Sequence, residues 1–74
     1  MMTDNVNKLE YLLKQLNHVI TSMRYSAARA LGEYGDPAAI EPLLQTLKND
    51  PVPAVRDAAR IALLELGVDP TFAD

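Results

Sequence analysis

The sequence predicts an all-α fold of four helices, arranged as two helical hairpins stacked on one another. Apolar residues recur at the three-and-four spacing of one helical face in four separate segments. Glycine and proline mark the ends of those segments, and no segment alternates with the period of two that is typical of strands. The second half of the chain also repeats the first. We therefore expect a single domain over residues 1–74, with unit one at about 4–35, unit two at about 36–67 and a tail at 68–74.

The first hairpin is predicted to begin near Asp4. Its first helix is expected to extend to about Asn17, and its second helix from about Ser22 to Tyr34. Gly35 follows directly, where a residue with positive φ commonly closes a helix. The residues that we expect in the core of this hairpin are Val6, Leu9, Leu12, Leu13, Leu16, Met23, Ala27, Ala30, Leu31 and Tyr34.

The second hairpin is predicted to begin at Asp36, which can cap a helix whose first turn contains Pro37. We expect one helix from there to about Lys48, in which Pro42 lies early enough to be tolerated. The expected core residues of this helix are Ile40, Leu43, Leu44 and Leu47.

The last helix is predicted after a proline-rich break at residues 49–53. Pro53 suits its first turn, and Gly67 ends it after Leu66 as Gly35 ends the second helix. The expected core residues of this helix are Val55, Ala59, Ala62, Leu63 and Leu66.

The internal repeat has the length of one hairpin. A shift of 32 residues places Arg24–Gly35 on Arg56–Gly67, with six of the twelve positions identical. A shift of 31 residues places Leu9–Leu16 on Ile40–Leu47 and matches their leucines. Amphipathic helices often share a leucine pattern, but chance would not readily reproduce the arginine, the small-residue spacing and the closing glycine together. The repeating unit is therefore a pair of helices.

The segment Met23–Pro37 resembles the second helix of HEAT-like repeats, in particular the short subtype named for phycobilisome lyases. That pattern has a helix that opens with Val-Arg and continues into an Ala-Ala…Ala-Leu-Gly run, and this segment has Met-Arg, Ala-Ala and Ala-Leu-Gly in the same order, followed by Asp-Pro. Val55–Leu63 follows the same pattern more loosely, with Val-Arg and Ala-Ala. The resemblance covers about residues 4–67 and implies a minimal α-solenoid, a fold that serves many unrelated functions.

Two departures from that pattern concern the end of the second unit. Leu64 stands where unit one has Gly32, and so fills a position of close packing. Val68–Phe72 is similar to the opening of a third unit, which we expect not to form. Because arrays of this kind usually need three or more units or capping ends, we expect Phe72, a second copy or a partner to cover the exposed end.

The same resemblance implies structural roles for two arginines. Arg24 and Arg56 open the second helix of each hairpin, where the family pairs the arginine with an acid in the loop of its own or the neighbouring unit. Asp50 is the nearest candidate for that acid. Gly35 and Gly67 are expected to be structural as well, since they close the two helices.

Candidate partner-binding residues lie on the outward side of the second helices, which in proteins of this type line the concave, partner-binding face. A rotation of 100° per residue places three residues of the second helix on one outward row, and their repeat equivalents on another. Aromatic residues are enriched at binding hot spots, whereas single exposed apolar residues are also ordinary on surfaces. The candidates are Tyr25, Arg29, Glu33, Asp57, Ile61 and Glu65.

Composition disfavours several other functions. The chain has no cysteine, so it can form no disulfide and offers no thiolate to a soft metal or a substrate. A net charge of −3 with scattered basic residues is unlike a nucleic-acid-binding surface. The chain has no apolar run of the roughly 20 residues that span a bilayer, and the N-terminus does not resemble a signal peptide, so we expect a cytoplasmic protein. His18, the only histidine, is expected in a turn, and we expect neither a metal nor a cofactor.

Two functions remain open from the sequence. The first is a protein-interaction or adaptor module that binds another protein or a second copy of itself, because no catalytic constellation is visible. It would use the concave side of its second helices or its open end. The second is an accessory role in bilin attachment, or in phycobilisome assembly or turnover, which the resemblance to lyases implies. Known lyases of that kind use much longer repeat arrays.

Overall fold

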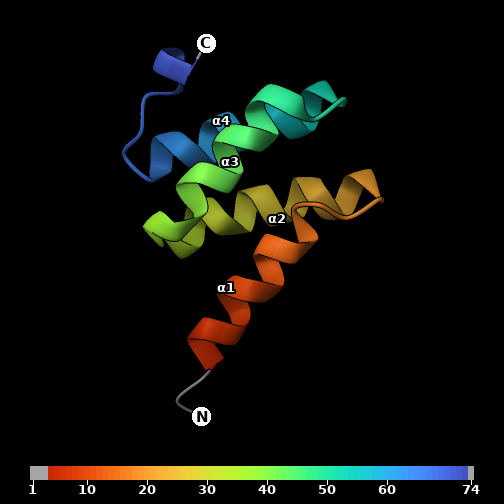
Figure 1. The fold of residues 1–74 in the computed structure, drawn as a ribbon, viewed down its shortest axis with the longest axis vertical. Helices are drawn as coiled ribbons and strands as arrows, with labels where there is room; N and C mark the ends of the chain where they lie inside the picture. Colours follow the sequence, from red (N-terminus) through yellow and green to blue (C-terminus); the bar gives the residue numbers. More distant parts are fainter. Residues whose placement is uncertain (1–3, 74) are drawn as a thin grey trace.

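The computed structural model describes residues 4–73, and within them the side chains of residues 8–71. This part of the chain is built from helices alone, with no strand, which confirms the predicted all-α fold (Figure 1). The side chains of Val6 and Phe72, for which we predicted a core and a capping role, lie outside the described side chains. The elements are α1 (Asp4–Gln15), α2 (Thr21–Tyr34), η1 (Pro37–Ala39), α3 (Ile40–Asn49), α4 (Pro53–Glu65) and η2 (Pro70–Ala73), where η marks a 3₁₀ turn.

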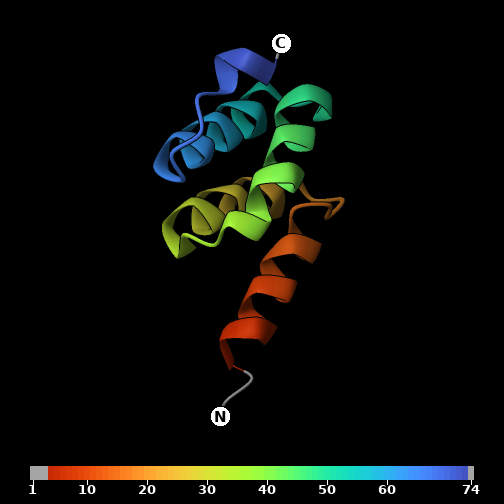
Figure 2. The same cartoon turned by 60° about the vertical axis from the view of Figure 1, so that its left-hand side comes forward.

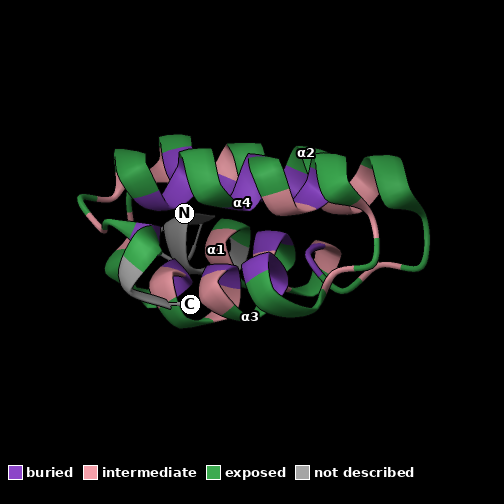
Figure 3. Cartoon of the chain, turned by 90° about the horizontal axis from the view of Figure 1, so that it is seen from above, coloured by how far each residue is buried: buried purple, intermediate pink, exposed green. Residues whose placement is uncertain are grey.

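The four helices form two layers. Helices α2 and α4 lie side by side in one layer and run in the same direction, while α1 and α3 lie in the other layer (Figures 2 and 3). The most extensive contact between elements joins α2 to α4, followed by the contacts of α3 with α4 and of α1 with α2. Each hairpin thus places its second helix against the second helix of the other hairpin, and the two hairpins share one core.

The core is made of leucine and alanine. Leu31, Leu43 and Leu63 are completely buried, one from each of three helices, and Leu12 and Leu16 extend the core into α1. Because α2 and α4 contribute mainly alanine where they meet, their backbones approach closely. The alanines buried in this region are Ala27, Ala28, Ala58, Ala59 and Ala62.

The predicted core of the second helices needs correction. Ala28 and Gly32, which we did not predict, are buried. The predicted Ala30 and Tyr34 are half-buried and pack against the core, and Met23 is half-buried. The apolar stripe of α2 is therefore wider than the sequence pattern suggested, because this helix is covered by its own hairpin on one side and by α4 on the other.

The single helix predicted from Pro37 to Lys48 is also wrong. The chain first forms the 3₁₀ turn η1, in which the amide of Ala39 donates to the carbonyl of Asp36 at 3.0 Å, and α3 begins only at Ile40. Proline has no N–H to donate to the carbonyl four residues before it, so Pro42 prevents α-helical bonding from extending back through Ala38.

The two glycines that we expected to close the second helices are both in the left-handed region. Gly35 has φ 86° and Gly67 has φ 85°, a conformation that costs a residue with a side chain about 1–2 kcal/mol. The amide of Gly35 donates to the carbonyl of Leu31 at 3.2 Å, and the amide of Val68 donates to that of Leu63 at 2.8 Å. These bonds satisfy carbonyls that the end of a helix leaves free.

Two helix ends are shorter than predicted. α1 stops at Gln15 rather than Asn17, because the amides of Asn17 and His18 bond to carbonyls three residues back and tighten the last turn. α4 stops at Glu65, one residue before the predicted Leu66.

Candidate functional site

The contact between α2 and α4 depends on a glycine in the middle of the interface. A Cβ atom placed on Gly32 would lie 2.7 Å from the Cα and 2.8 Å from the Cβ of Ala62, and would also collide with a carboxylate oxygen of Glu65. Real Cβ atoms essentially never lie that close to other heavy atoms. Gly32 therefore allows α4 to pack directly on the backbone of α2.

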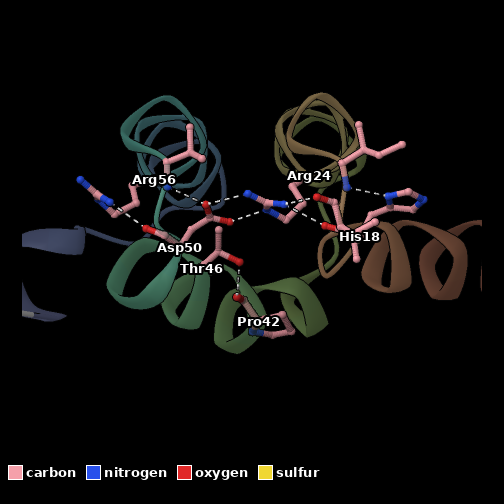
Figure 4. A network of polar contacts seen from close by, with 9 residues as sticks. His18, Arg24, Pro42, Thr46, Asp50 and Arg56 are labelled. Atoms are coloured by element: carbon pink, nitrogen blue, oxygen red, sulfur yellow. Dashed lines mark hydrogen bonds and ion pairs between the residues drawn. The ribbon is translucent and has the colours of Figure 1, made fainter.

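A polar network joins the loops of the two hairpins beside this contact (Figure 4). The Nε of Arg24 donates to Asp50 Oδ2 at 2.8 Å, and its second terminal nitrogen donates to Asp50 Oδ1 at 3.2 Å. Its other terminal nitrogen donates to the carbonyls of His18 and Val19, at 2.9 and 3.1 Å. One guanidinium from unit one thus binds its own loop and the loop of unit two at the same time.

Asp50 is held in its charged form. Burial of the carboxylate disfavours the charge, but the hydrogen bond from Arg24, the bond from the Val52 amide and the charges of Arg24 and Arg56 outweigh it, so the pKa of Asp50 lies below its ordinary value. In return, the hydrogen bond to Asp50 raises the pKa of Arg24. The side chains are well covered, at 13% exposed for Arg24 and 6% for Asp50, so solvent screens the pair less than an ordinary surface pair.

Asp50 and His18 are equivalent residues of the two loops, and their side chains accept similar hydrogen bonds. Asp50 Oδ1 accepts a bond from the Val52 amide at 3.0 Å, and His18 Nδ1 accepts one from the Ile20 amide, also at 3.0 Å. Both side chains therefore support the turn that begins the second helix, in α4 and α2 respectively. We expected His18 in a turn, but the sequence pattern did not indicate this hydrogen bond from the Ile20 amide.

All six candidate partner-binding residues are exposed, and we call them together the outer face. They are Tyr25, Arg29 and Glu33 on α2, and Asp57, Ile61 and Glu65 on α4. Figure 3 shows that α2 and α4 are exposed on the side that faces away from α1 and α3. The two apolar members remain 39% exposed for Tyr25 and 41% for Ile61.

The aromatic residue of the outer face is held in place by its neighbour. Arg29 donates to the hydroxyl of Tyr25 at 3.2 Å, and its guanidinium carbon lies 6.0 Å from the centre of that ring. This contact with Tyr25 raises the pKa of Arg29, and the charges of Glu33 and Glu65 raise it further. Because Glu65 belongs to α4, the outward rows of the two helices are electrostatic neighbours.

Four other large apolar side chains of the described residues are exposed. Val19 and Ile20 in the first loop are 89% and 53% exposed, Tyr11 on α1 is 56% exposed, and Leu64 on α4 is 56% exposed. The sequence pattern did not indicate that Val19 and Ile20 would be exposed. Leu64 is more than half exposed, so it does not fill a closely packed position in the described chain.

The structure also has an open groove of about 510 Å³ beside the first loop. Its lining includes His18, Arg24, Thr46 and Asp50. The two charged groups are paired with each other, and the hydroxyl of Thr46 donates to the carbonyl of Pro42 at 3.1 Å. The charged lining of the groove is therefore already engaged within the chain.

Comparison with known families gives the same answer as the packing of the two hairpins. A family model for HEAT repeats matches residues 3–67, which is most of the chain. The chain belongs to the HEAT-repeat family. Comparison with curated proteins gives no match.

HEAT repeats generally mediate protein–protein interaction and typically act as scaffolds rather than enzymes. The family match does not distinguish the short phycobilisome-lyase subtype from other HEAT repeats, so a bilin-related role stays a prediction.

Two further features of this HEAT-repeat chain concern metal binding and membrane crossing. Over the residues that the structure describes, no three His, Cys, Asp or Glu side chains are grouped so that they could hold a metal ion. Within the same part of the chain, no helix has the length and apolar character needed to cross a membrane.

Proposed function

We propose that this protein is an interaction module that binds another protein through the outer face of α2 and α4. One observation carries the proposal: Tyr25 and Ile61 are exposed on neighbouring helices of one layer, with charges of both signs around them. Apolar anchors within a polar rim are the common anatomy of protein interfaces.

The state of Tyr25 supports its role as an anchor. Its hydroxyl and its ring are both in contact with Arg29, so the side chain is ordered before a partner arrives. Ordering a side chain at an interface costs about 0.5–1.5 kcal/mol, and a preordered aromatic avoids much of that cost. Tyrosine and arginine are also among the residues that contribute most to binding when an interface covers them.

The scaffold beneath the outer face supports the same function. Both helices are fixed by alanine packing and by the Gly32 contact, so the spacing between the two rows is set by a rigid interior. A binding surface on rigid helices keeps its geometry better than one on loops.

The test replaces each of the two apolar side chains of the outer face. The wild-type protein is used to isolate partners from an extract of its native source, and a partner purified in turn is titrated by calorimetry. We expect Tyr25→Ala and Ile61→Asp each to weaken binding by about tenfold or more, which corresponds to about 1.4 kcal/mol.

Tyr11→Ala is the control, because Tyr11 is an exposed aromatic on α1 in the opposite layer. We expect it to bind with the wild-type affinity. If no protein is retained, or if Tyr11→Ala weakens binding as much as Tyr25→Ala, the outer face is not the binding surface.

A further inference from the structure

The first loop (residues 16–20) and the second loop (residues 50–52) lead into α2 and α4 with the same kind of hydrogen bond but with different acceptors. In the second loop, the carboxylate of Asp50 accepts from the amide of Val52. In the first loop, Nδ1 of His18 accepts from the amide of Ile20. Histidine is the side chain that ordinarily changes its charge between pH 5 and 8, whereas an aspartate is already charged there. The two equivalent bonds therefore respond differently to mild acid.

The hydrogen bond at His18 requires a neutral ring. A neutral imidazole has one nitrogen that carries a proton and one that accepts a hydrogen bond, while a protonated imidazole carries a proton on both nitrogens. Because Nδ1 accepts from the Ile20 amide, the proton of the neutral ring is on Nε2. A second proton, taken up at Nδ1, turns this acceptor into a donor. The ring and the Ile20 amide then present two donors to each other, so the bond is lost.

The surroundings of His18 offer little compensation for a positive charge on its ring. Among the described residues, no carboxylate lies within ion-pair distance of this ring. Arg24 lies between the first loop and Asp50, and the carboxylate of Asp50 is already bound to it (Figure 4). From α1, the charged residue in the turn that leads into the loop is Lys14, a second cation. The residues of α3 that line the adjoining groove are uncharged: Pro42, Gln45, Thr46 and Asn49.

The same loop residues bind the arginine that joins the two units. One terminal nitrogen of Arg24 donates to the carbonyls of His18 and Val19, and the rest of its guanidinium holds Asp50 of unit two. The ring bond fixes the amide of the next residue, Ile20, which is the N-cap residue of α2. The groups that bind Arg24 and the amide that binds the ring therefore belong to three consecutive residues. A loop that loses the bond at the ring also loses part of what orients its carbonyls toward Arg24.

We propose that the first loop is a pH-sensitive switch, in which proton uptake by His18 breaks its bond to the Ile20 amide and loosens the contact of the loop with Arg24. In the neutral form, the loop holds the exposed side chains of Val19 and Ile20 in one position. In the protonated form, these two apolar side chains are released, while the second loop keeps its structure because its acceptor is Asp50. The switch uses none of the six residues of the outer face, so it does not depend on the proposed binding function.

The test follows two amides in one sample. Solvent exchange of the Ile20 and Val52 amides is measured by NMR from about pH 8 to about pH 5, with the intrinsic pH dependence of exchange divided out, while the ring nitrogens of His18 report its protonation. We expect the protection of the Ile20 amide to fall about two- to tenfold as the ring takes up its proton, which is the range for one hydrogen bond. The guanidinium signals of Arg24 should change with the same midpoint. Val52 is the internal control, and its protection should stay constant because Asp50 stays charged.

Two substitutions separate the ring of His18 from the rest of the loop. His18→Asn supplies a side-chain oxygen that accepts a hydrogen bond and takes up no proton in this range, so the Ile20 amide should keep its protection from pH 8 to pH 5. His18→Ala removes the acceptor, so the Ile20 amide should already show at pH 8 the low protection that the wild type shows at pH 5. His18 is outside the buried core, and circular dichroism checks that both variants keep the helical fold.

Four results would overturn the proposal. The first is a constant protection of the Ile20 amide over this range, whether or not the ring takes up a proton. The second is an equal loss at Val52, because mild acid then loosens both loops alike. The third is a pH dependence that persists in His18→Asn, since another group is then responsible. The fourth is a set of Arg24 signals that do not change with the His18 ring, because the loop is then not coupled to the contact between the units.

Discussion

The two halves of this chain are the same hairpin in two different environments. In unit one, the far side of the second helix is covered: Gly32 contacts Ala62, and Arg24 holds a carboxylate. In unit two, the equivalent Leu64 and Arg56 have no such neighbour in the described chain. The difference shows that local sequence makes each hairpin, whereas the next hairpin decides whether a surface position becomes interior. The predictions below test that comparison.

The largest effect on the free energy of unfolding is expected at core positions where the two units are alike. Leu31 and Leu63 are equivalent and both completely buried, so Leu31→Ala and Leu63→Ala should each lower the free energy of unfolding by about 2–5 kcal/mol. A domain of this size has only about 4–11 kcal/mol in total. Urea titration followed by circular dichroism measures both losses. A loss below about 1 kcal/mol for either residue would mean that the two units do not share one core.

The next effect separates the two units. Gly32→Ala forces a methyl group against the backbone of Ala62, and overpacking of this kind costs about 1–3 kcal/mol. Alanine also favours the helix by about 1 kcal/mol, so we expect a net loss of up to about 2 kcal/mol.

The matched control is Leu64→Ala at the equivalent position of α4. Leu64 is exposed, so we expect this substitution to change the free energy of unfolding by no more than about 0.5 kcal/mol. Urea titration of both variants gives the comparison. Equal losses at the two positions would show that α4 is as covered as α2.

A smaller effect is expected at the ion pair between the units. Asp50→Asn keeps the size of the side chain but removes the charge that Arg24 binds, and we expect a loss of about 1–2 kcal/mol at pH 7. The control is His18→Asn, the equivalent change in a loop that pairs with no arginine of another unit. It should cost no more than about 0.5 kcal/mol.

The same pair predicts the sign of a pH effect. The folded pKa of Asp50 is below its unfolded value, so its contribution is complete above the unfolded pKa of about 3.9 and is lost as the pH falls through the folded pKa. The difference in stability between wild type and Asp50→Asn should therefore be present at pH 7 and should shrink as the pH falls below about 3.9 and through the lower folded pKa of Asp50. A difference that stays constant over this range would show that the charge on Asp50 does not stabilise the stack.

The smallest effect is expected on the outer face. Tyr25→Ala and Ile61→Asp remove exposed side chains that the core does not need, so each should change stability by no more than about 0.5 kcal/mol, with Tyr25→Ala slightly destabilising through loss of the Arg29 contact. Thermal unfolding measures this directly. A cooperative loss of several kcal/mol would mean that these residues belong to the core rather than to a binding surface.

The features that could be predicted from the sequence are those set by a few neighbouring residues. The leucine spacing predicted the helices, Gly35 and Gly67 predicted the left-handed residues that follow the second helices, and Asp36 predicted a capped turn, because capping is local chemistry. Pro42 was judged by its position alone, and its missing N–H removed a turn of the predicted helix.

The features that could not be predicted depend on the stack. Ala28 is buried and its repeat equivalent Arg60 is exposed, so no repeat pattern could assign the burial of that position. Asp50 could be predicted as the acid partner of Arg24, because it lies in the loop where the family resemblance places that acid. That no carboxylate among the described residues lies within ion-pair distance of Arg56 is visible only once the neighbours of α4 are known. The outer face, in contrast, was predicted as exposed from helical periodicity, although periodicity does not identify what binds there.

The central claim is that unit two packs on unit one through direct contact of α4 with the backbone of α2 at Gly32. Solution NMR tests it most directly, as a nuclear Overhauser effect between the α protons of Gly32 and the methyl group of Ala62. The account predicts a strong cross-peak, because a Cβ on Gly32 would lie within 2.8 Å of that methyl carbon. A folded, helical sample without this cross-peak would contradict the stacked arrangement.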